Sequence, residues 1–182
     1  MTLNTKLLLL LVWFSSQASV VCFSTIPDPV PTDFSDKPFV RWTLRSDSPF
    51  YASPILEENT VYIGGLDSTF YAVNTENGSV RWTFCTKGEI RSNCCRWNDY
   101  LFLNGGDGNL YCLDEQNGTC QWTFQTNGEQ KQDFADYFHS TPVIAGDTLY
   151  IGSGDGKLYA IHCKNGQLIW SFETTGVVHT TP

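Results

Sequence analysis

The sequence lacks the features that mark a membrane-spanning, a helical or a nucleic-acid-binding protein. Its longest apolar run, residues 7–14, is too short to cross a bilayer, which takes a helix of about 20 apolar residues. No stretch has apolar residues every three to four positions, so we expect no amphipathic helices. Basic residues are scarce, with 11 Lys and Arg against 19 Asp and Glu. The net charge of -8 would repel the phosphates of nucleic acids, so no nucleic-acid partner is expected.

The first residues are typical of a secretory signal peptide. Lys6 supplies a positive charge, residues 7–14 form the apolar part, and Ser16-Gln17-Ala18 is a small-x-small cleavage site. We therefore expect a signal peptide over residues 1–18, with no transmembrane segment after its removal and a secreted or periplasmic mature chain. The alternative is a buried or anchoring N-terminal segment. Residues 19–36 are interpreted as a Pro/Ser-rich linker, because Pro disrupts helices and central strands.

A motif of eleven residues occurs three times, at residues 72–82, 112–122 and 160–170. Each copy is an alternating apolar strand, then Asn-Gly, then a second strand that ends in Trp. Asn-Gly between two such strands is the strongest short signal of a β-hairpin. The residues that recur at matching positions are Trp42, Trp82, Trp122 and Trp170, the hairpin glycines Gly78, Gly118 and Gly166, and Gly88, Gly128 and Gly176, six residues after a Trp. We interpret them as structural residues of a repeat.

Each repeat holds four short strands in about 40 residues, which is the spacing of one blade of a β-propeller. The second half of the unit contains a Gly-rich turn with an acid, at Asp67, Asp107 and Asp155. We interpret these acids as turn formers that belong to separate blades. The prediction is an all-β protein: a β-propeller of four-stranded blades over residues 37–182, with about three blades present and the ring incomplete. Residues 38–44 are predicted as an outermost strand whose blade has no other members.

The repeated motif, Ala-x-Asn/Asp-x-x-Asn-Gly-x-x-x-Trp, resembles the tryptophan-docking motif of PQQ-like (pyrroloquinoline-quinone-like) β-propeller repeats. The segment from Asp155 to Ala160, Asp-Gly-Lys-Leu-Tyr-Ala, strengthens the resemblance. In that family each Trp packs between neighbouring blades, and rings close with about eight blades. The resemblance covers nearly all of the chain after the expected signal peptide and implies a structural role for the recurring Trp and Gly residues.

The same family contains enzymes and proteins without enzymatic activity, so the resemblance leaves the function open. We favour a non-catalytic exported scaffold or protein-interaction module with a protein partner. This would be similar to the propeller lipoprotein of the bacterial outer-membrane assembly machinery and associated with the outer membrane. One alternative is a fragment of a PQQ-dependent alcohol or sugar dehydrogenase, which would bind the quinone and calcium. Another is the propeller portion of a larger eukaryotic protein.

The dehydrogenase alternative directs attention to Cys94 and Cys95, because many of those enzymes carry a disulfide between adjacent cysteines beside the cofactor. This pair stands where other repeats have Ile55-Leu56 and Val143-Ile144, which favours core packing over a disulfide. The six cysteines after Cys22 allow 15 pairings, and the sequence does not choose among them. No set of calcium ligands can be placed. We therefore assign no catalytic, cofactor-binding or metal residue.

Two further groups of residues are candidates for contact with a partner or ligand. An insertion after Gly128 carries Phe134, Tyr137 and Phe138 on a loop between blades, and aromatic residues on such a loop suit an interaction surface. The alternative is a loop folded onto its own blade. The equivalent residues Tyr51, Ile90, His139 and His179 are expected to surround the axial channel at the start of the innermost strands. The alternative for the two histidines is a solvated loop position.

Overall fold

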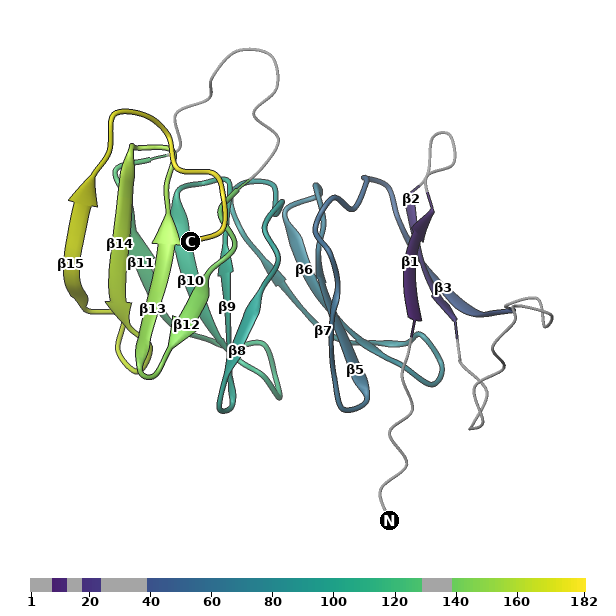
Figure 1. Ribbon diagram of the computed structural model, residues 1–182. Coiled ribbons are helices and arrows are strands. Elements are labelled where there is room, and N and C mark those ends of the chain that lie inside the picture. Colours follow the sequence, from purple (N-terminus) through teal and green to yellow (C-terminus); the bar gives the residue numbers. More distant parts are fainter. Residues whose placement is uncertain (1–7, 13–17, 24–38, 129–138) are drawn as a thin grey trace, which may run out of the picture.

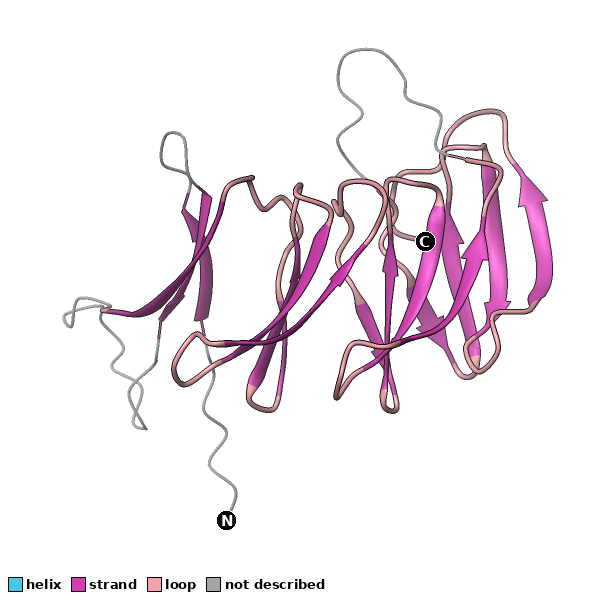
Figure 2. Ribbon diagram, turned by 180° about the vertical axis from the view of Figure 1, so that it is seen from behind, coloured by secondary structure: helices cyan, strands magenta, loops and turns pink. Residues whose placement is uncertain are grey.

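The computed structural model describes residues 8–12, 18–23, 39–128 and 139–182, and these residues form β-strands and no helix. The strands make four antiparallel sheets that stand side by side like the blades of a fan (Figure 1). Figure 2 shows from behind that the four sheets do not close into a ring. The predicted all-β, incomplete propeller is therefore confirmed. Within the described ranges there is no helix long and apolar enough to pass through a membrane.

Three of the sheets are complete four-stranded blades, in which a short inner strand is followed by three longer ones. The first blade consists of β4 (Ile55–Glu57), β5 (Thr60–Gly64), β6 (Thr69–Asn74) and β7 (Val80–Cys85). The second consists of β8 (Cys95–Trp97), β9 (Tyr100–Asn104), β10 (Asn109–Asp114) and β11 (Cys120–Gln125). The third consists of β12 (Val143–Ala145), β13 (Thr148–Gly152), β14 (Lys157–His162) and β15 (Leu168–Glu173).

The fourth sheet precedes these blades and has three strands, β1 (Leu8–Val12), β2 (Ala18–Phe23) and β3 (Val40–Ser46). The strand expected over residues 38–44 is present as β3, but the expectation that it has no partner strands is wrong. β2 pairs with β3 along its length, and β1 pairs with β2. Strand β1 lies in the expected signal peptide and β2 in the expected linker. Both are runs of apolar and β-branched residues, which also favour strands.

The core is divided into clusters that lie between successive sheets. Trp42 and Leu44 of β3 pack with Val61 and Ile63 of β5, while the second and third blades meet through an equivalent cluster. Nearly all residues of β5 and β9 are buried, without alternation between buried and exposed positions. The reason is that a neighbouring sheet covers each face of these strands. Each buried aliphatic or aromatic side chain contributes roughly 1.5–3 kcal/mol, so the contacts between blades carry much of the stability.

Candidate functional site

Three of the four recurring indoles each reach across to the hairpin of the following blade. The Nε1–H groups of Trp42, Trp82 and Trp122 donate to carbonyl oxygens one blade further on, over 2.7, 3.1 and 3.1 Å. The accepting residues are Thr75, Glu115 and Cys163. These bonds satisfy the polar edge of each ring while its faces stay in the apolar contact between blades.

The same indoles lie directly over the Asn-Gly turns, which explains the hairpin glycines. Gly78, Gly118 and Gly166 have φ angles of 72°, 72° and 69°, in the left-handed region that favours glycine. A Cβ atom at each would come within 3 Å of the neighbouring indole. The tight turn and the docked Trp therefore require glycine for two independent reasons.

The fourth indole has no blade to contact in the described residues. Trp170 of β15 is 43% exposed and Phe172 is 63% exposed, whereas their equivalents in the first two blades are at least half-buried. The ring of Tyr150 lies 5.9 Å from the Trp170 ring and keeps it on the same face of the sheet as in the other blades. The third blade consequently presents an aromatic surface.

The glycines that follow each Trp differ in their surroundings. A Cβ at Gly88 would lie 2.6 Å from the backbone of Gly106 and Asp107, so the close approach of two chain segments explains this glycine. At Gly128 and Gly176 a Cβ would meet nothing within 4 Å. The packing around Gly176 therefore gives no reason for a glycine there.

The acids of the Gly-rich turns hold the blades together, in addition to forming their turns. Asp67, Asp107 and Asp155 each accept a backbone N–H two residues on, as a turn former does. Each also accepts a hydrogen bond from a tyrosine hydroxyl four residues on, and one from the strand or loop of the preceding blade. Burial and the neighbouring Asp raise the pKa of these tyrosines, Tyr71, Tyr111 and Tyr159. This second role was not predicted, although the Asp-x-x-x-Tyr spacing is visible in the sequence.

The adjacent cysteines are free thiols, so the alternative of a disulfide between Cys94 and Cys95 is not found. Neighbouring residues of an extended chain point to opposite faces of a sheet. Accordingly, Cys94 packs in the cluster between the first and second blades, and Cys95 packs against the one between the second and third. Burial raises the pKa of Cys94, and it raises that of Cys95 to about 12, so both thiols stay protonated and weakly nucleophilic.

The expected set of axial residues is only partly brought together. The rings of His139 and His179 lie 6.5 Å apart in an edge-to-face arrangement. Ile90 is fully buried, so the expectation that it lines the channel is wrong. The next residue, Arg91, instead places its guanidinium 5.3 Å from the centre of the Tyr51 ring. The expectation chose the wrong member of an alternating pair of positions. Residues Phe134, Tyr137 and Phe138 lie outside the described residues.

A cleft between the second and third blades was not anticipated. It has a volume of about 560 Å³ and is lined by the β8–β9 hairpin and the β14–β15 turn: Arg96, Trp97, Asn98, Asp99, Tyr100 and Lys164. We call it the hairpin cleft. The rings of Trp97 and Tyr100, which pair across the hairpin, are nearly parallel, with 20° between their planes and 6.3 Å between their centres.

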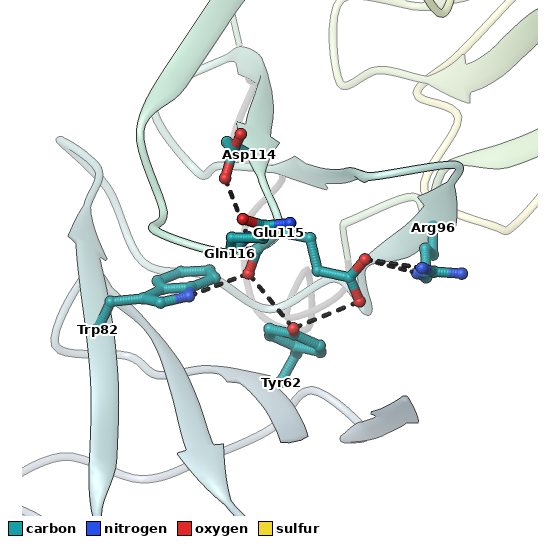
Figure 3. A network of polar contacts seen from close by, with 6 residues as sticks. All are labelled: Tyr62, Trp82, Arg96, Asp114, Glu115 and Gln116. Carbon is teal, nitrogen blue, oxygen red and sulfur yellow. Dashed lines mark hydrogen bonds and ion pairs between the residues drawn. The ribbon is translucent and has the colours of Figure 1, made fainter. Parts of the chain in front are cut away.

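A polar network supports one wall of the hairpin cleft (Figure 3). The carboxylate of Glu115 accepts a hydrogen bond from Nε of Arg96 over 2.8 Å, and Nη2 of Arg96 lies 2.8 Å from the same oxygen. The backbone oxygen of Glu115 accepts the indole N–H of Trp82, while the Tyr62 hydroxyl is 3.4 Å from both the backbone and the carboxylate oxygen. Burial, followed by the negative charge of Glu115, raises the pKa of Tyr62 to about 12.

The second blade differs from the other two at the positions of Arg96, Trp97 and Tyr100. The strand registers place Glu57 and Ala145 at the position of Trp97, and Thr residues at the position of Tyr100. Leu56 and Ile144 stand at the position of Arg96, and Ile55 and Val143 at that of Cys95. The predicted alignment of Cys94-Cys95 with Ile55-Leu56 and Val143-Ile144 is therefore wrong by one residue. The departures were visible in the sequence, and comparing the repeats position by position would have found them.

The described residues do not fit a calcium-bound quinone. They bring no three His, Cys, Asp or Glu side chains together in a way that could hold a metal ion. The adjacent cysteines, which a dehydrogenase would place beside its cofactor, are buried in two separate cores. No step of quinone chemistry can therefore be assigned to these side chains.

Comparison with known proteins agrees with this architecture. Residues 40–179 match the family model described as outer membrane protein assembly factor BamB. No curated protein matches the chain in sequence. BamB from Moraxella catarrhalis is similar in structure with a TM-score of 0.62 at 17% identity, over 74% of this chain and 40% of that one.

Two other kinds of solved structure share the fold. The quinohemoprotein alcohol dehydrogenase from Comamonas testosteroni has a TM-score of 0.58 at 18% identity, over 68% of this chain and 21% of that one. The computationally designed protein Ika8 has a TM-score of 0.68 at 14% identity, over 93% of this chain and 50% of that one. The chain thus spans half or less of each of these proteins, and identities this low show the fold alone.

Proposed function

Because the chain belongs to the family of outer membrane protein assembly factor BamB, a family of PQQ-like repeat propellers, we propose that it is a non-catalytic, exported scaffold or protein-interaction module. The family model matches residues 40–179, which include the three complete blades. In this role the protein would bind a protein partner outside the cytoplasm. It would be associated with the outer membrane, as in the assembly factor that names the family.

The single observation that carries the proposal is the match of the family model to residues 40–179. At β15 the described residues leave an aromatic face uncovered, on which a further blade of the ring or a partner would pack. Elsewhere in the fold the equivalent indoles donate to a carbonyl and cover a glycine of the next blade. Trp170 and Phe172 offer the same face with 43% and 63% of their surfaces exposed. Aromatic side chains on a rigid strand are typical anchors of protein interfaces. A further blade of the ring, or a partner, would present a glycine-bearing turn with an acceptor carbonyl opposite Trp170.

The side chains with reactive groups support a non-catalytic role. The thiols of Cys94, Cys95, Cys112 and Cys163 have pKa values raised by burial, which keeps them protonated at neutral pH. The turn acids are hydrogen bonded to tyrosines and to the preceding blade. These groups hold the blades together, while Cys85 and Cys120 are exposed free thiols.

Photo-crosslinking in cells tests the partner. A crosslinking amino acid in place of Phe172 should join the chain to one defined protein. The same group in place of Ser171, which is also exposed but on the opposite face of β15, should not. Equal adducts from both positions would contradict the proposed surface.

Two further measurements test the absence of catalysis and the export. Titration of the chain with pyrroloquinoline quinone and calcium should give no stoichiometric absorbing complex and no dye-linked oxidation of alcohols or sugars. Such a complex with activity would refute the scaffold proposal in favour of a dehydrogenase. N-terminal sequencing of the mature chain should begin at residue 19, which would remove β1 and leave β2 paired with β3. An intact N-terminus would contradict export by a cleaved signal.

A further inference from the structure

The hairpin cleft combines aromatic rings with polar groups of both charges, and the proposed function makes no use of it. We propose that this cleft is a binding site for a neutral carbohydrate. The inference does not rest on the proposed function, because the cleft lies between the second and third blades, away from the exposed face of β15.

The β8–β9 hairpin does not need the aromatic pair to form. The first and third blades form the same hairpin with Glu57 and Ala145 in place of Trp97, and with Thr60 and Thr148 in place of Tyr100. Large aromatic residues on a turn that other repeats build without them point to a contact with a ligand.

The rings suit the apolar C–H faces of a sugar. Trp and Tyr bury a large apolar area with few rotatable bonds, so holding a ligand against them costs little side-chain entropy. Both residues stand on paired strands, and each packs partly against the core cluster between the second and third blades. The two rings are therefore preorganised, which favours recognition of a rigid ring.

The polar groups around the rings suit hydroxyl groups, each of which donates and accepts. Asn98 offers an amide, Asp99 an acceptor and Lys164 donors. The carboxylate of Glu115 binds Nε and Nη2 of Arg96. The third guanidinium nitrogen of Arg96, Nη1, carries two further N–H donors. Glu115 also neutralises the charge of Arg96, and the other two charged residues of the lining, Asp99 and Lys164, have opposite signs. A phosphate or an acidic peptide would favour uncompensated cations, so the balance favours a neutral ligand.

The dimensions agree with a small ligand. The hairpin cleft has a volume of about 560 Å³ and is open to solvent, so it has room for a small ligand and would cover only part of its surface. One or two sugar rings would occupy it, with a longer oligosaccharide continuing into solvent.

The test is calorimetric titration of the full chain with neutral oligosaccharides of α-linked glucose, β-linked glucose, N-acetylglucosamine and mannose. At least one should bind. The variant Trp97→Glu should weaken that binding at least about tenfold, as loss of a central aromatic anchor does. Ala145→Glu is the matched control, because it places the same charge at the equivalent position of the third blade, and it should bind as the wild type does. Lys164→Gln should weaken binding about threefold to tenfold, as expected for the loss of a hydrogen bond.

Circular dichroism and thermal unfolding show whether each variant folds, and Lys164→Gln carries the test if Trp97→Glu does not. Inorganic phosphate and an acidic peptide serve as competing probes. The proposal is overturned if none of the sugars binds at millimolar concentration, if binding is unchanged in the folded cleft variants, or if phosphate or the peptide binds at the cleft instead.

Discussion

Replacing Gly118 with alanine tests whether the docked indole of Trp82 requires a glycine opposite it. Gly118 has a φ angle of 72°, and a Cβ atom there would lie 2.7 Å from Cδ2 and 2.9 Å from Cζ3 of Trp82. Two carbon atoms do not approach so closely, so the indole must move. Its hydrogen bond to the Glu115 carbonyl, now 3.1 Å long, would be strained or lost.

The expected destabilisation is the balance of four contributions. Alanine at positive φ costs about 1–2 kcal/mol. Overpacking against the indole costs about 1–3 kcal/mol, and loss of the hydrogen bond costs about 0.5–1.5 kcal/mol. Alanine lowers the conformational entropy of the unfolded chain, which stabilises the folded state by about 0.4–1 kcal/mol. We expect Gly118→Ala to lower the free energy of unfolding by about 2–5 kcal/mol.

A second glycine in a tight turn separates backbone strain from the effect on the indole. Gly146 also has a positive φ angle, 60°, but a Cβ atom there would meet nothing within 4 Å. Gly146→Ala should therefore lower the free energy of unfolding by only about 1 kcal/mol. This is the cost of the strained backbone minus the stabilisation that comes from the lower entropy of the unfolded chain.

Urea unfolding followed by circular dichroism measures both free energies, because this signal does not depend on the environment of one indole. Equal losses in the two variants would refute the reasoning that the docked Trp adds to the requirement for glycine that the turn sets at Gly118.

Three further predictions follow from the contacts between blades. Asp107→Asn should lower the free energy of unfolding by about 1–2 kcal/mol, since a charged acceptor for Tyr111 and for the preceding blade is lost; urea unfolding measures it. Because the pKa of Tyr62 is raised from 10 to about 12, the stabilisation linked to its proton is complete below pH 10 and lost between pH 10 and 12; Tyr62→Phe should flatten this fall in unfolding experiments. Trp122→Ala should cost about 2–4 kcal/mol and Trp170→Ala less than about 1 kcal/mol, because only the first ring is docked on a following blade.

Each of these has a control or a contrary result. Asp147→Asn changes an exposed acid of the β12–β13 turn and should alter stability by less than about 0.5 kcal/mol. The pKa values of Tyr71, Tyr111 and Tyr159 are also raised, so part of the alkaline fall in stability should survive Tyr62→Phe, and an unchanged fall would contradict the prediction. Equal losses from the two Trp variants would contradict the difference in docking.

Much of the fold could be predicted because the repeat constrains it several times over. Asn-Gly determines the hairpin turn and the spacing of the Trp residues determines the length of a blade, so each copy supports the assignment of the others. The N-terminal sheet could not be predicted in this way. Residues 8–12 and 18–23 are apolar and carry no repeat motif, and an apolar segment near an N-terminus suits a signal peptide as well as a strand.

The candidate sites were harder to predict because they depend on contacts between blades. The hydrogen bond from Lys87 to Asp107 joins residues 20 positions apart, and it follows from how two sheets are stacked. At Ile90 and Arg91 the prediction was wrong by one residue. Arg91 stands nine residues after Trp82, as Tyr51 does after Trp42, and its side chain is 11% exposed whereas Ile90 is fully buried. The hairpin cleft arises where Trp97 meets a turn of the next blade near Lys164, and only the assembled blades bring them together.

Hydrogen exchange of the indole N–H groups, measured by NMR with each Trp assigned, tests the central claim most directly. If docked indoles join successive blades, the N–H groups of Trp42, Trp82 and Trp122 should exchange slowly, because each is bonded to a carbonyl of the next blade. The N–H of Trp170, which is 43% exposed, should exchange rapidly. Fast exchange at the three docked positions, or equal rates at all four, would contradict the account.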